Sequence, residues 1–298
     1  MKRLICGLAA CVASLALFSF KPISDDGPGS PADSSFRIKT VIVDAGHGNY
    51  HPTGTGGYFS KGADGTYSHE RDVTLAVAKK LQAAIENQLT DVKAVLTRTT
   101  DDDVSWQNRA QIANDNKGDL FISLHCNSLG DRHVRELVGH KHHKPVYRTI
   151  SVPDRSGRGV LILVYGTWRT KEEENAIKHN QVEEDAEVNT EAMNTNDPTT
   201  LILINQFKAR FRKQSIRLAN LINDEFTQTD GRPSDGIREQ GIYVLCHSAM
   251  PTVLVEMGYI NNPQDEDYLN SDKGQNEIVA SIVRAIQKYK DEVEQVSR

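Results

Sequence analysis

The chain has 298 residues, of which 38% are hydrophobic and 25% charged, which is ordinary for a globular protein with a sizeable core. Its formal net charge is −5. Because there is no basic excess to neutralise phosphates, the composition excludes a nucleic-acid binder that works by counterion release, and no nucleic-acid partner is expected.

The first residues have the pattern of an export signal. Lys2 and Arg3 precede an apolar stretch that is too short and too weakly flanked for a membrane span. We therefore expect a signal peptide over residues 1–20, an exported protein and no stable membrane span in the mature chain. An uncleaved anchor and lipidation at Cys11 are the alternatives. Residues 21–35, rich in Pro, Gly, Ser and Asp, predict a flexible linker.

From residue 36 onward, predicted strands and helices alternate, which indicates one α/β domain over residues 36–298. The strands are continuously apolar, as in sheets covered on both faces. Apolar residues at three- and four-residue steps predict the covering helices. We expect a mostly parallel sheet with helices on both faces and a site at the C-terminal strand ends. The predicted strands are residues 37–46, 93–98, 119–127, 159–166 and 251–259, and the helices include residues 73–85, 207–222 and 278–289.

Two segments interrupt this alternation and are interpreted as insertions. Residues 129–158 are basic, rich in histidine and weakly periodic, whereas residues 170–198 are acidic and contain a candidate helix. Long insertions in compact domains are typically functional lids or irregular loops. The run "HKHH" at residues 140–143 could bind metal, but a solvated tract or a substrate-facing patch is the simpler interpretation.

Three residues at the expected edge of the sheet predict a zinc site. His47 follows the first predicted strand, His125 ends the third, and Glu70 precedes an amphipathic helix. Two imidazoles and one carboxylate form a ligand set that leaves a fourth zinc position open for water. Each residue alone has a simpler explanation, because a strand-end histidine is often a surface residue and a glutamate often complements a helix dipole.

Glu256 is a candidate for proton transfer at this site. It lies at the end of an apolar predicted strand, where a carboxylate without a partner would be costly. A carboxylate beside a metal can take a proton from water and return it to a leaving nitrogen. The alternative is that Glu256 caps the following turn. We further expect Asp44 to orient an imidazole, and Arg98 and Arg109 to be structural, with stem-carboxylate binding as their alternative role.

Two cysteines remain beyond the signal segment, Cys126 and Cys246. Both lie in apolar runs, where cysteine behaves as a small hydrophobic residue. A disulfide between them and two buried free thiols are both open at this point.

The sequence resembles the zinc-dependent N-acetylmuramoyl-L-alanine amidases of cell separation and spore wall lysis. The resemblance covers residues 38–290, and the motifs that carry it are "VIVDAGHG", "HERD", "TRTTDD" with "NRAQIAN", "SLHCN" and "VLVEMGYINNPQDEDYL". It implies a six-stranded α/β domain and one zinc ion per chain, held by His47, Glu70 and His125, with Glu256 catalytic.

The implied reaction is hydrolysis of the peptidoglycan amide between N-acetylmuramic acid and L-Ala, at the cell wall or in the periplasm. Residues 170–198 resemble the inserted segment of regulated amidases, which implies that a glutamate there blocks the zinc until a protein activator displaces it. A different zinc peptidase acting on wall peptides, such as a carboxypeptidase, and a non-catalytic wall-binding module are the alternatives.

Overall fold

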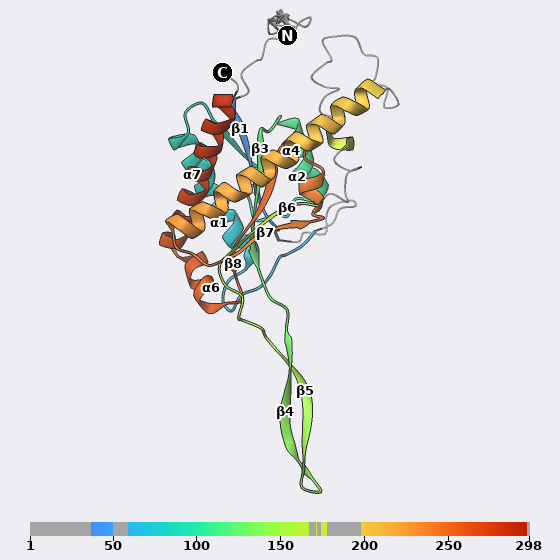
Figure 1. Cartoon of the computed structure of the whole chain (residues 1–298). Coiled ribbons are helices and arrows are strands. Elements are labelled where there is room, and N and C mark those ends of the chain that lie inside the picture. Colours follow the sequence, from blue (N-terminus) through green and yellow to red (C-terminus); the bar gives the residue numbers. More distant parts are fainter. Residues whose placement is uncertain (1–36, 50–58, 167–170, 172–173, 178–197, 297–298) are drawn as a thin grey trace, which may run out of the picture. The chain divides into compact units, whose positions relative to one another are not determined.

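The structure is a computed structural model that describes residues 37–49, 59–166, 171, 174–177 and 198–296 (Figure 1). The predicted signal peptide at residues 1–20 and the predicted linker at residues 21–35 lie outside the described residues. Most of the acidic insertion at residues 170–198 lies outside them as well. No helix in the described part of the chain is long and apolar enough to cross a bilayer.

A six-stranded sheet forms the centre of the domain, in the order β2-β1-β3-β8-β6-β7. All neighbouring strands are parallel except β6 and β8, which are antiparallel. The six-stranded, mostly parallel sheet is thus confirmed. The strands are β1 (Thr40–Ala45), β2 (Lys93–Leu96), β3 (Leu120–Asn127), β6 (Val160–Tyr165), β7 (Ser234–Gln240) and β8 (Thr252–Tyr259).

Helices cover both faces, because the central strands alternate apolar side chains between two cores. In β3, Leu120, Ile122 and Leu124 belong to the core beneath α1 (Glu70–Gln88), α4 (Pro198–Asp224) and α7 (Asp272–Val296). Phe121 belongs to the opposite core, with α2 (Trp106–Asp115) and α5 (Tyr243–Cys246). Each large side chain buried in this way contributes about 2 kcal/mol. The segment η3 (Glu225–Thr229) follows α4, and α6 (Pro263–Asn270) precedes α7.

The basic insertion is an ordered β-hairpin and not an irregular loop. Strands β4 (Arg132–Lys141) and β5 (Lys144–Val152) pair antiparallel, with a bulge between Leu137 and Gly139. His142 and His143 form the two-residue turn, and both have positive φ, at 50° and 59°, as hairpin turns of this length require. The hairpin extends away from the sheet (Figure 1), and its residues are mostly exposed.

Cys126 and Cys246 are both buried, and no disulfide joins them. They belong to the two cores on opposite faces of the sheet. The structure therefore favours two free thiols over a disulfide, and burial raises the pKa of the Cys126 thiol well above its ordinary value.

Candidate metal centre

His47, Glu70 and His125 converge at the end of the sheet where β1 and β3 terminate. His47 lies two residues after β1, Glu70 is the first residue of α1, and His125 lies near the end of β3. One ligand atom from each residue lies within 4.8 Å of the others, and no other such group of His, Cys, Asp or Glu occurs in the described residues. The histidines of the hairpin turn therefore form no comparable metal group.

Glu70 is the central member of this group. Its Oε1 atom lies 3.1 Å from His47 Nε2 and 3.0 Å from His125 Nδ1. Burial by itself raises the pKa of Glu70, but hydrogen bonds from His125 and His47 outweigh it and hold the pKa well below its ordinary value. Burial lowers the pKa of His125. Both shifts favour an ionised carboxylate beside a neutral imidazole, which are the protonation states that bind metal.

Backbone groups hold two of these side chains in place. His47 Nδ1 lies 3.0 Å from the carbonyl oxygen of Ser60 and donates to it, so Nε2, on the side of Glu70, is the ring nitrogen available to a metal. Glu70 accepts from the backbone N–H of Ala63 at 2.7 Å and from that of Cys126 at 2.9 Å. The loop that contains Ser60 and Ala63 thus supplies the outer contacts of the site, which the sequence analysis did not identify.

Two glycines make room for the ligands. A Cβ atom at Gly46 would lie 2.5 Å from His125 Nε2, and one at Gly62 would lie 2.8 Å from Glu70 Oε2 and 2.9 Å from the His47 ring. Gly62 also has a φ of +77°, which favours glycine. The two nitrogens, the carboxylate, the oriented imidazole and this glycine cradle fit a zinc ion.

His47 has a strained backbone that two buried arginines stabilise. Its φ is 61°, which is uncommon for a residue other than glycine. Arg109 donates to the carbonyl oxygens of His47 and Ala45, and Arg98 donates to those of Ala45 and Gly46. The structural role expected for both arginines therefore extends to the turn that carries His47.

The expected role of Asp44 is corrected by the structure. Its carboxylate makes no hydrogen bond or ion pair with a histidine of the described residues. It accepts from Thr97 Oγ1, Ser123 Oγ and Arg109 Nη1, and the Arg109 contact is a buried ion pair of 2.7 Å. Asp44 pairs in register with Ser123, so it lies along the strand and not at the turn. The carbonyl of Ser60 orients the His47 imidazole instead.

Glu256 lies within β8, directly opposite His125 of β3 in the strand register. It is not at the strand end where the sequence placed it. Its Oε2 atom is buried without a hydrogen-bond partner. Burial, and to a lesser extent the charge of Glu70, raises the pKa of Glu256 to about 8. A buried carboxyl with an unused oxygen and a raised pKa beside a ligand group is suited to exchange protons there.

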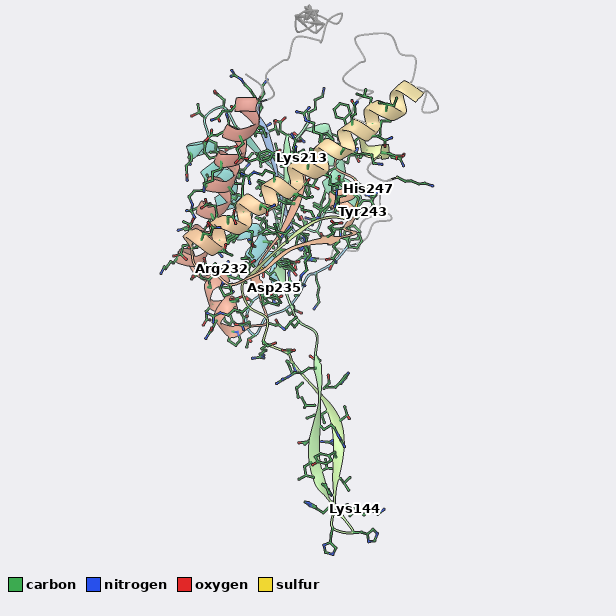
Figure 2. The ribbon with its side chains drawn as sticks, in the orientation of Figure 1. Lys144, Lys213, Arg232, Asp235, Tyr243 and His247 are labelled. Carbon is green, nitrogen blue, oxygen red and sulfur yellow. The ribbon has the colours of Figure 1, made fainter. Side chains whose placement is uncertain are left out.

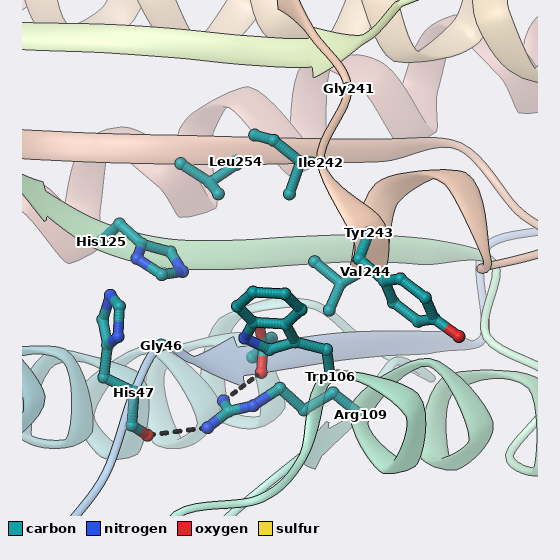
Figure 3. Close-up of a pocket in the computed structure, with 11 residues that line it drawn as sticks. Gly46, His47, Trp106, Arg109, His125, Gly241, Ile242, Tyr243, Val244 and Leu254 are labelled. Atoms are coloured by element: carbon teal, nitrogen blue, oxygen red, sulfur yellow. Dashed lines mark hydrogen bonds and ion pairs between the residues drawn. The ribbon is translucent and has the colours of Figure 1, made fainter. Parts of the chain in front are cut away.

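A cavity of about 470 Å³ opens beside the two histidines (Figure 3). Its apolar lining includes Trp106, Ile242, Tyr243, Val244 and Leu254. Trp106 and Tyr243 are not among the site residues predicted from the sequence. One feature of the sequence could have indicated Trp106. It is the first residue of α2, directly after Ser105, whose side chain caps this helix a few residues beyond the "TTDD" motif.

The blocking glutamate expected within residues 170–198 is largely beyond the described residues. Glu174 is described, and it forms an ion pair of 2.8 Å with Lys208 of α4. Its ion-pair partner is thus not a member of the candidate metal group, and this residue gives the hypothesis no support. The other glutamates of the insertion stay untested.

Comparison with known proteins gives concordant matches. Residues 41–288 match the family described as N-acetylmuramoyl-L-alanine amidase. The amidase AmiA of Salmonella typhimurium is 25% identical over 251 residues, covering 84% of this chain and 76% of AmiA. The structure of the amidase AmiC2 of Nostoc punctiforme superposes with a TM-score of 0.54 at 25% identity, covering 84% of this chain and 96% of that one. The CwlD amidase of Clostridioides difficile, solved in complex with the GerS lipoprotein, shares the fold, with a TM-score of 0.54 at 20% identity and coverage of 84% and 98%.

Proposed function

This chain belongs to the N-acetylmuramoyl-L-alanine amidase family, and we propose that it performs the family's reaction with a zinc ion held by His47, Glu70 and His125. The reaction hydrolyses the peptidoglycan amide between N-acetylmuramic acid and the L-Ala of the stem peptide. A bound zinc ion would supply Lewis-acid chemistry, polarising the amide carbonyl and lowering the pKa of water to about 7.

Glu256 carries the proton in this proposal. The observation that supports it most strongly is the buried, unpartnered Oε2 atom of Glu256, on the strand next to His125. Its ionised form accepts the proton of the attacking water. The resulting carboxylic acid then donates that proton to the leaving nitrogen of L-Ala, which restores the carboxylate.

The test uses the purified protein with peptidoglycan and follows new free amino groups on L-Ala. We expect the groups to form, to disappear after treatment with a chelator and to return when zinc is added. Metal analysis should give one zinc ion per chain in the active protein and none in a His47→Ala, His125→Ala double variant. A metal-free protein that is fully active would refute the proposed centre.

The same assay separates the alternatives. A carboxypeptidase would release a terminal amino acid and leave the muramoyl amide intact, which product masses distinguish. A wall-binding module would bind peptidoglycan and yield no product from wild type or from Glu256→Gln. The cavity beside the histidines favours an enzyme, because it presents a concave apolar surface next to the ligand group.

Two further proposals concern location and control. Residues 1–20 direct export, so that the enzyme meets peptidoglycan outside the cytoplasm; mass analysis of the exported protein would identify the cleaved N-terminus. Residues 170–198 restrain the centre until a protein partner acts, and a protein of this fold has been solved with a lipoprotein partner. Deletion of residues 170–198 should then raise basal activity, and unchanged activity would refute this control.

A further inference from the structure

The cavity beside the ligand group has an aromatic wall that core packing does not explain. Trp106 is the first residue of α2, and 37% of its surface is exposed. Figure 3 shows its indole between the imidazoles of His47 and His125 on one side and Val244 on the other. An exposed tryptophan beside a reaction centre is more informative than a scattered surface residue, because it offers a flat apolar surface to a ligand.

The charged groups that line this cavity neutralise each other. Asp44 and Arg109 form a buried ion pair of 2.7 Å, and Arg109 Nη2 makes a second ion pair of 2.7 Å with Asp103. Among the described lining residues, Arg109 is the only arginine or lysine. Apart from the proposed zinc ion, the described lining therefore provides no available cation for a stem carboxylate, and a carboxylate buried there without a partner would be costly.

The two sides of the scissile amide differ in charge, and this lining favours an uncharged group. On one side is the muramic acid sugar, which is uncharged once its lactyl carboxyl is in amide linkage. On the other side is the stem peptide, which carries free carboxylates. We propose that the cavity binds the N-acetylmuramic acid ring against the indole of Trp106, while the stem peptide extends away from it. This inference rests on the proposed function.

Two substrates with the same lactyl–L-Ala amide test the inference. The first is N-acetylmuramoyl tripeptide, and the second is the N-lactoyl tripeptide that lacks the sugar. For Trp106→Ala, we expect kcat/KM to fall about tenfold on the sugar substrate, mainly through KM, and less than twofold on the lactoyl peptide. Trp106→Phe should retain most activity. The control is Leu203→Ala on α4, which has the same 37% exposure and should leave both values unchanged.

Each result has a defined meaning. Equal losses on both substrates would overturn the sugar assignment, because the indole would then act on the amide or the peptide. If wild type cleaves neither substrate, the proposed function fails, but calorimetry still decides this inference. Binding of N-acetylmuramoyl methylamide should weaken about tenfold in Trp106→Ala, and unchanged binding would overturn the inference.

The β4–β5 hairpin carries an independent surface. Leu137 and Tyr147 face each other across the two strands and are both exposed, and the guanidinium of Arg135 lies 4.7 Å from the centre of the Tyr147 ring. An isolated two-stranded hairpin is only marginally stable in water. An exposed aromatic and cationic face on such an element is typical of a binding surface.

The charge of the hairpin indicates its ligand. Lys141 and Lys144 are exposed at the free end, where Figure 2 shows Lys144, and Arg132 is exposed at the start of β4. These cations belong to a chain with a net charge of −5. Peptidoglycan repeats stem carboxylates along each glycan strand. We infer that the hairpin binds this polymer away from the cleavage centre, an inference that also rests on the proposed function.

Matched charge variants test the hairpin. The first replaces Arg132, Lys141 and Lys144 by Gln, and its control replaces three exposed lysines of the sheet-and-helix body, Lys79, Lys93 and Lys213. We expect cosedimentation with purified sacculi at low salt to fall at least fivefold for the hairpin variant and less than twofold for the control. Higher salt should remove the difference.

Three outcomes would overturn the hairpin inference. Equal losses for both variants would show that net charge alone drives binding. Unchanged sacculus binding with lost binding to vesicles of phosphatidylethanolamine and phosphatidylglycerol would assign the hairpin to a lipid surface. Unchanged binding to both would remove the hairpin from either role. Failure of the proposed function is separate, because it is measured as absent cleavage of soluble muramoyl peptide.

Discussion

Replacing Glu256 by Gln should lower activity and raise stability in the same variant. The loss of activity follows from removing the group that carries the proton in the proposed reaction, and it should be about 10²- to 10⁴-fold in kcat. The gain in stability follows from the cost of burying this carboxyl. Its Oε2 atom has no hydrogen-bond partner, and burial together with Glu70 raises its pKa from about 4.5 to about 8.

The magnitude follows from the raised pKa. At pH 7 the carboxyl of Glu256 is ionised in the unfolded chain and mostly protonated in the folded, metal-free chain. Protonating it costs about 1.4 kcal/mol per pH unit above 4.5, or about 3 kcal/mol at pH 7. Burying the amide of Gln itself costs about 1–2 kcal/mol, which reduces the gain in stability by that amount. We therefore expect metal-free Glu256→Gln to be about 1–2 kcal/mol more stable than wild type.

The sign of the pH dependence provides the sharper check. Because the folded-state pKa is raised, the carboxyl does not destabilise the fold below pH 4.5, and its cost grows as pH rises to about 8. Urea unfolding of chelator-treated protein should show the variant about 1–2 kcal/mol less stable than wild type near pH 4, where only the cost of burying the amide remains. The variant should be more stable than wild type near pH 8. A variant that is less stable than wild type at pH 8, or that keeps wild-type kcat, would refute the reasoning.

Three other substitutions test the supports of the centre. Glu70→Gln removes the shared carboxylate, so zinc affinity measured by chelator competition should fall at least about 100-fold, and retained affinity would exclude Glu70 as a ligand. Gly62→Ala places a Cβ atom 2.8 Å from Glu70 Oε2 at a φ of +77°. It should lower the free energy of unfolding in urea by about 1–2 kcal/mol and weaken zinc binding. Wild-type values of both would contradict the predicted crowding. Asp44→Asn should lower the free energy of unfolding by about 3–5 kcal/mol at pH 7. Burial alone raises the pKa of Asp44, but Arg109 and two hydroxyl hydrogen bonds lower it overall, so this difference should fade as pH drops below about 4, and a constant difference would contradict the ion pair.

The sequence predicted the central strands and the ligand group for one physical reason. Continuous apolar runs ending in polar residues specify buried parallel strands, and parallel strands bring their ends together. This places His47 just after one strand and His125 near the end of its neighbour. Strand β7 was missed because it lies at the edge of the sheet and has the polar sequence "SDGIREQ", without an apolar run.

The outer contacts of the site could not be predicted, because they depend on backbone positions and not on residue types. The carbonyl of Ser60 and the N–H of Ala63 are groups that every such residue carries, and only the folded loop brings them to His47 and Glu70. The same limit explains the error at Asp44. Proximity in sequence suggested a contact with His47, whereas the strand register directs its carboxylate to Ser123.

The position of Asp44 shows how the strained backbone of His47 can be stabilised by a residue that is not itself a member of the candidate metal group. The positive φ of His47 costs about 1–3 kcal/mol, and the turn has few side chains of its own to stabilise it. Arg109 donates a hydrogen bond to the carbonyl oxygen of His47, and its ion pair with Asp44 holds Arg109 against strand β1. Asp44, which was predicted to contact the imidazole of His47, thus acts through Arg109 on the backbone of His47 instead. Loss of Asp44 should therefore reduce the stability of the turn before it changes the chemistry of the centre.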